Sequence, residues 1–250
     1  MGKSRSFKEL DQLKFGEITI PLEIHHEWRQ SARVSISRNK AIVRLPILVA
    51  NSTREQHLSW AKDWILKKLR KDHNLLNHFH LKDYQSGQQI TVRNTVFTLD
   101  VKVAEGRSSA SGKRIGRTIF ITLPSGLDPT QKNKVCSHII HKVMSRTYLH
   151  HLQRRVTELN DLYFNMEVNE IRLRNNTSNW GSCSSNKNIS ISSRLLLAPD
   201  FVLDYIIIHE LAHLVHHNHS AQFWALVASV MPDYMKAENW ISSHGGSINW

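Results

Sequence analysis

The sequence is poor in cysteine and in long apolar runs. Its 250 residues include two cysteines, Cys136 and Cys183, too few for a disulfide framework or a four-thiolate metal site. Apolar runs such as Tyr205–Ile208 are short, whereas a helix that spans a bilayer needs about 20 apolar residues. The first ten residues, MGKSRSFKEL, lack the apolar core of a secretory signal. We therefore expect a cytoplasmic protein without membrane partners.

Acidic residues are scarce relative to basic ones. The chain has 33 Lys and Arg against 21 Asp and Glu, a net charge of +12. Residues 201–250 contain one base, Lys236, and four acids, so the excess lies in the first 200 residues. A basic body is typical of proteins that bind nucleotides or nucleic acid, and also of surfaces whose charge serves solubility. The sequence leaves both interpretations open and does not predict an oligomeric state.

Hydrophobic periodicity predicts an α+β protein. Apolar residues at helical spacing predict two helices, over 53–71 and 131–164. Alternation with period two predicts strands at 18–20, 34–36, 41–45, 95–101, 118–123, 170–174 and 188–192.

The organisation of the chain follows from these elements. Residues 106–117, rich in Gly, Ser and bases, lack the spacing of a phosphate-binding loop and predict a mobile hairpin tip. We find no internal repeat. We divide the chain into a tail (1–17), a strand-rich basic region (18–130) and a domain over 131–250.

The segment His209-Glu210-Leu211-Ala212-His213 has the pattern H-E-x-x-H. Residues four apart on a helix are neighbours on one face, so His209 and His213 can grip one metal ion. Glu210 lies about 100° around the helix and can reach a metal-bound water from the side. The apolar residues before the motif should bury this helix. The pattern therefore predicts a metal site with a catalytic base.

A third ligand is needed, and His216, His217, His219 and His244 compete for the role. In a continued helix His216 would lie about 10.5 Å along the axis from His209, too far to share the ion. A helix that ends near His216 and turns back brings His219 to the metal, and Asn218 tolerates the left-handed conformation such a turn requires. Ser220 can then cap a following helix. We therefore predict His219 as the third ligand.

The segments HELAHLVHHNHSAQFW, LLLAPDFVLDYIII and NWGSCSS resemble the YgjP-like metallopeptidase family, a relative of the SprT-like and WLM zinc peptidases. The resemblance implies a zincin-like metallopeptidase domain with an active-site H-E-x-x-H helix. It implies Zn²⁺ on the three histidines already named, with Glu210 as the base. The chain departs from the family pattern at Asn179, where Arg is common, and at Ser192-Ser193, where Asn-Trp is common.

Residues outside the metal motif are also candidates. We expect some residues of the family motifs to contact the substrate or support the ligands. They are Trp180, Gly181, Ser182, Cys183, Arg194 and Asn218.

The predicted activity is hydrolysis of a peptide bond by metal-activated water. Two alternatives stay open: a metal-dependent nucleoside triphosphate pyrophosphohydrolase, and a nucleic-acid-associated protease module whose basic region binds the nucleic acid. The substrate is thus predicted to be a peptide or a nucleotide, with nucleic acid as a further partner.

Overall fold

The computed structural model describes residues 6–37, 40–72, 75–76, 79, 83–176 and 179–250. The chain divides into two compact units, Met1–Leu81 and Lys82–Trp250. Within the described residues, no helix is long and apolar enough to cross a membrane.

The first unit is a four-stranded sheet with one helix. The strands are β1 (Phe7–Phe15), β2 (Ile18–Glu27), β3 (Arg33–Ile36) and β4 (Ala41–Pro46), in the order β1-β2-β4-β3. Strands β2 and β4 are parallel, and both outer pairs are antiparallel. Helix α1 (Asn51–Lys71) buries Ala61, Ile65 and Leu69 against this sheet.

The second unit begins with the same arrangement. Its strands are β5 (Gln89–Val92), β6 (Thr95–Ala104), β7 (Ser111–Ile115) and β8 (Thr118–Pro124), in the order β5-β6-β8-β7. Again the second and fourth strands are parallel and the outer pairs antiparallel. Helix α2 (Pro129–Tyr163) follows as α1 does, and its first turn has a capping box between Asp128 and Gln131. The fold therefore contains a repeat that the sequence does not display.

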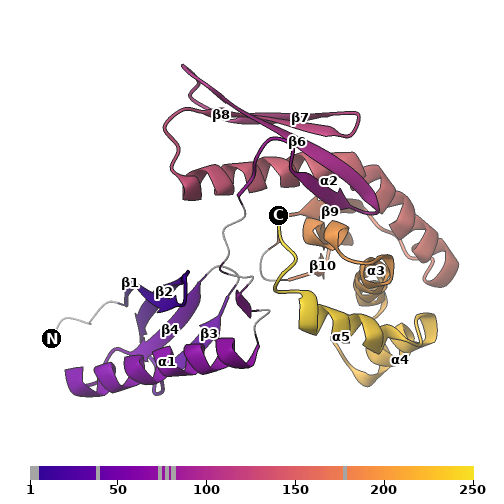
Figure 1. The fold of residues 1–250 in the computed structure, drawn as a ribbon. Coiled ribbons are helices and arrows are strands. Elements are labelled where there is room, and N and C mark those ends of the chain that lie inside the picture. The colour runs from indigo at the N-terminus through magenta and orange to yellow at the C-terminus, as the bar shows by residue number, and fades with distance from the viewer. Residues whose placement is uncertain (1–5, 38–39, 73–74, 77–78, 80–82, 177–178) are drawn as a thin grey trace. The chain divides into compact units, whose positions relative to one another are not determined.

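The rest of the second unit surrounds the metal motif. A small sheet has the order β10-β11-β9, with β9 at Glu170–Arg174, β10 at Gly181–Cys183 and β11 at Asn188–Ser192. The 3₁₀ turn η2 (Ser193–Leu197) leads to α3 (Asp200–Val215), α4 (Ala221–Val230) and α5 (Tyr234–His244). In Figure 1 helix α2 lies between the β5–β8 sheet and this part. The amino-terminal half of α2 packs on that sheet, and Leu152, Val156 and Leu159 pack in the core around α3.

Most predicted elements are confirmed, and four features differ. Residues 7–15, expected in the tail, form edge strand β1, whose side chains are all exposed over residues 7–10 and alternate between half-buried and exposed only over residues 11–15. Residues 111–115, expected in a hairpin tip, form β7. The structure separates its units at residues 81 and 82, not at 130 and 131, because α2 shares a core with the strands before it. Helix α5 was not predicted.

Candidate metal centre and its surroundings

Helix α3 carries the H-E-x-x-H segment as predicted. Eight of its apolar residues are buried, which fixes the helix in the core and leaves His209 and His213 half-buried at its surface. The two imidazole ring centroids are 5.0 Å apart, as expected for residues separated by four positions.

The chain turns back immediately after α3. The helix is capped by His216 in an extended conformation (φ −125°, ψ 108°), and the side chain of Ser220 accepts a hydrogen bond at the start of α4. His219 lies in this turn, with its Nε2 3.0 Å from Nε2 of His209. The turn was predicted, but the left-handed conformation expected at Asn218 was wrong, since Asn218 is not among the described residues with positive φ.

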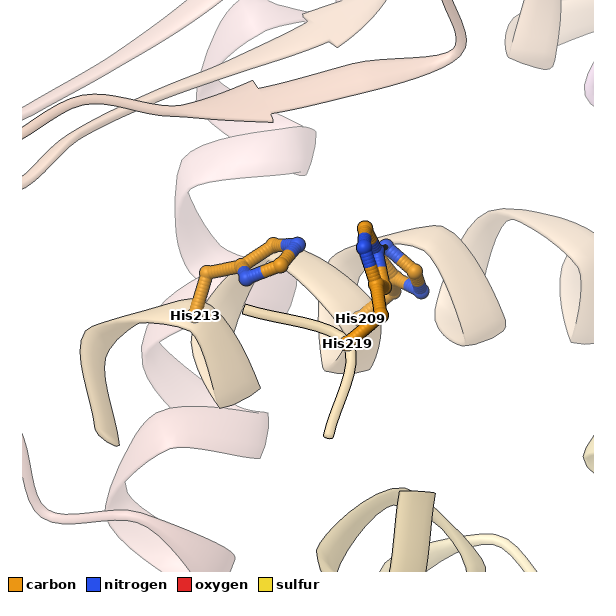
Figure 2. A group of neighbouring side chains, drawn as sticks. All are labelled: His209, His213 and His219. Carbon is orange, nitrogen blue, oxygen red and sulfur yellow. Dashed lines mark hydrogen bonds between the residues drawn. The ribbon is translucent and has the colours of Figure 1, made fainter. Parts of the chain in front are cut away.

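Three imidazoles converge at this point (Figure 2). One nitrogen from each of His209, His213 and His219 lies within 4.8 Å of the others. Nitrogens that share one ion at 2.0–2.1 Å with tetrahedral angles would be about 3.3 Å apart, close to the 3.0 Å between His209 and His219. The spacing of the donors therefore fits a single metal ion.

The protonation of the imidazoles also fits a metal. Burial, followed by the neighbouring His213 and His219, lowers the pKa of His209 to about 4, and burial likewise lowers the pKa of His213. Nδ1 of His213 lies 3.1 Å from the carbonyl oxygen of His216, which holds the tautomer that donates there and leaves Nε2 free to bind. Neutral imidazole is the form that binds a metal. The residues present thus suit the metal ion that the motif predicts.

Glu210 is buried between α3 and β10. A Cβ built on Gly181 would lie 2.7 Å from Cγ and 2.8 Å from Cδ of Glu210, so the carboxylate rests directly on the bare Cα of the glycine. Burial raises the pKa of Glu210 to about 8, and a backbone hydrogen bond from Cys183 partly opposes that rise. The sequence did not predict this role of Gly181, which only the packing of β10 on α3 creates.

Strand β10 is the edge of its sheet. The backbone N–H of Ser192 donates to Trp180, and that of Ser184 donates to Asn188, so residues 180 and 184 face β11. By alternation, the backbone groups of Gly181 and Cys183 point away from β11. The outer edge of the strand therefore runs beside Glu210, to which the Cys183 N–H donates, while the Gly181 carbonyl accepts from the side chain of Asn179.

Two hollows meet at Glu210. The first, here called the Glu238 hollow, has a volume of 390 Å³ and extends between β10, α3 and α5. The second, the His217 hollow, has a volume of 600 Å³ and extends over the three histidines and residues 181–185. Gly181, His209 and Glu210 line both. A groove thus continues on both sides of the candidate base.

The remaining predicted residues have distinct positions. Trp180 lines the Glu238 hollow, while Ser182 and Cys183 line the His217 hollow. Arg194 is buried, with its guanidinium carbon 3.7 Å from the ring centroid of Trp180, so it supports the wall from behind. Asn218 is exposed and is not among the residues lining either hollow.

Cys183 is an alternative candidate for the nucleophile. Burial, with Glu210 nearby, raises the pKa of its thiol to about 11. Since the thiolate is the reactive form, this environment disfavours nucleophilic chemistry at Cys183.

The lining residues that were missed from the sequence include Tyr205, Glu238, Ile241 and Ser242. A signal existed only for Tyr205, which lies four positions before His209 and meets its ring edge-on at 5.9 Å. The other three come from α5, which the sequence did not predict.

Residues 30–244 match the family model described as YgjP-like, metallopeptidase domain. A crystal structure of the metallopeptidase zymogen of Pyrococcus abyssi abylysin is 25% identical, with a TM-score of 0.34, over 36% of this chain and 90% of that chain. No curated protein matches the chain.

Proposed function

The chain belongs to the YgjP-like metallopeptidase family, and on that premise we propose that it is a zinc-dependent peptidase. His209, His213 and His219 would hold the ion, and Glu210 is the general base. The observation that carries the proposal is the convergence of three imidazole nitrogens within 4.8 Å beside a buried carboxylate. Three histidines with an open fourth position are a common ligand set of catalytic zinc.

When bound, the ion supplies positive charge that polarises water and a substrate carbonyl and favours the ionised form of Glu210. Glu210 accepts the proton of the attacking water and delivers it to the leaving amine. Gly181 and the backbone of Cys183 hold the carboxylate in place for both transfers.

The shape of the site favours a peptide substrate. The Cys183 N–H is bonded to Glu210 and the Gly181 carbonyl accepts from the Asn179 side chain, so an extended peptide would pair with the outer edge of β10 through the Gly181 N–H and the Cys183 carbonyl. Side chains of such a peptide would enter the hollows on either side.

The charge of the walls bears on the nucleotide alternative. Among the described residues that line the two hollows, none is lysine or arginine. The bases of residues 106–117 lie on and around β7, whose sheet packs on the other core of the unit. Hydrolysis of a nucleoside triphosphate and binding of nucleic acid therefore remain predictions from charge alone.

The test is a product screen on purified, zinc-loaded protein with casein-type peptides and nucleoside triphosphates. Glu210→Gln keeps the side-chain shape and removes the base, so peptide turnover should fall by about 10²–10⁴ while folding and metal content persist. Glu167→Gln, which removes an exposed carboxylate paired with Lys187, is the matched control and should retain turnover. Unchanged turnover in Glu210→Gln would exclude Glu210 as the base.

A further inference from the structure

The Glu238 hollow has mostly apolar walls, and its acidic lining residues are Glu238 and the candidate base Glu210. Trp180, Ile206 and Ile241 form apolar parts of its lining. Its 390 Å³ lies within the roughly 300–1,000 Å³ typical of ligand pockets. Because His209 and Glu210 also line it, the hollow opens directly onto the proposed reaction centre.

Glu238 is fixed within this hollow but has no cationic partner. The Tyr205 hydroxyl donates to its Oε1 at 2.8 Å, which joins α5 to α3 and holds the carboxylate. Within the described part of the chain, no Lys, Arg or His forms an ion pair with Glu238.

Two basic side chains, one on α5 and one that lies against Trp180, are engaged elsewhere. Lys236 pairs with Asp233 at 2.6 Å. Arg194 lies against Trp180 and donates to the carbonyl oxygens of Asn176 and Gly245. The half-buried carboxylate of Glu238 therefore faces the hollow without a positively charged partner, and a positively charged ligand group would provide that partner.

We propose that the Glu238 hollow is a specificity pocket that selects a lysine or arginine side chain next to the cleaved bond. The aliphatic stem of such a side chain packs on Trp180 and Ile241, and its charged end pairs with Glu238. The inference rests on the proposed peptidase function and names its substrate class: basic peptides, cleaved beside a Lys or Arg.

The first experiment compares cleavage of matched peptides that carry Lys, norleucine or Glu on either side of the bond. We expect kcat/KM to be about 10-fold or more higher for Lys than for norleucine, the size expected for a hydrogen bond to a charged group. Glu238→Gln retains an oxygen for the Tyr205 hydroxyl and removes the charge. It should abolish the Lys preference, so that this variant cleaves the Lys and norleucine peptides with kcat/KM values within about twofold of each other.

Charge reversal gives a second readout that a purely structural role would not produce. Glu238→Lys should shift the preference from the Lys peptide to the Glu peptide. Glu167→Gln is the control for the loss of one surface carboxylate and should keep the Lys preference. An equal loss on all three peptides in Glu238→Gln would show that Glu238 only supports the fold, and would overturn the inference.

Binding separates this inference from the proposed function. Fluorescein-labelled Lys and norleucine peptides are titrated against Glu210→Gln protein, with anisotropy as the readout. We expect about 10-fold tighter binding of the Lys peptide, reduced by Glu238→Gln. If no peptide is cleaved but this binding difference persists, the peptidase function fails and the pocket stands. If peptides are cleaved and bound without regard to charge, the pocket fails and the peptidase stands.

Discussion

Replacing Gly181 with alanine tests whether the bare Cα beside Glu210 positions the base. The backbone of Gly181 lies outside the left-handed region, so alanine meets no backbone strain there. Its Cβ, however, would lie 2.7 Å from Cγ of Glu210, whereas carbon atoms normally approach to about 3.5–4.0 Å. The buried carboxylate must therefore move by about 1 Å.

A displacement of about 1 Å at a catalytic group can lower turnover by about 10²-fold. Overpacking of this kind also costs about 1–3 kcal/mol of stability. We expect kcat for a peptide to fall by about two orders of magnitude, with metal content unchanged, because the three histidines are not displaced. The assay is steady-state cleavage, accompanied by metal analysis and thermal unfolding.

Gly112→Ala is the matched control. Its Cβ would collide with the side chain of Ile139 on α2, far along the chain from the metal motif and in the other core of the unit. It should lower the melting temperature comparably but leave kcat within about twofold, because its clash involves no residue of the candidate site. Full kcat in Gly181→Ala would refute the reasoning that the glycine positions Glu210.

Three further predictions concern the metal, acid stability and the basic strand. His219→Ala should strongly reduce zinc retention in metal analysis, whereas His216→Ala should not, because His216 supplies only its backbone carbonyl; the reverse result would contradict the assigned turn. A hydrogen bond from Lys40 leads the interactions that lower the pKa of Glu23 to about 2, so its stabilisation is present above about pH 4.5 and is lost as pH falls towards 2. In urea unfolding at several pH values, the free energy of unfolding should therefore fall less in acid for Glu23→Gln than for the unchanged protein. An equal fall in both proteins would contradict this assignment. Changing Lys113, Arg114 and Arg117 together to Glu, in and beside β7, should leave peptide cleavage within about twofold. A salt-sensitive loss of nucleoside triphosphate hydrolysis alone would favour the nucleotide function.

Local sequence was sufficient for the core of the candidate site. Helical periodicity placed His209 and His213 on one face, and the position of Ser220 marked the start of the next helix after a short turn. These predictions succeeded because neighbours within a helical turn are fixed by backbone geometry, whatever the rest of the fold does. The prediction of a left-handed conformation at Asn218 failed because several backbone conformations can reverse a chain, and the spacing of residues does not choose among them.

The periphery of the site depended on contacts between distant segments. Glu210 meets Gly181 across 29 positions of sequence, and Tyr205 meets Glu238 across 33. Likewise, only the packing of α2 on the β5–β8 sheet showed that this helix shares a core with the strands before it. The sequence by itself determined the three metal-binding candidates and the candidate base, because local geometry brings them together. Tertiary packing alone decided what holds Glu210 and which acid lines the hollow beside it, because those contacts join elements whose order in the chain does not specify their distance in space.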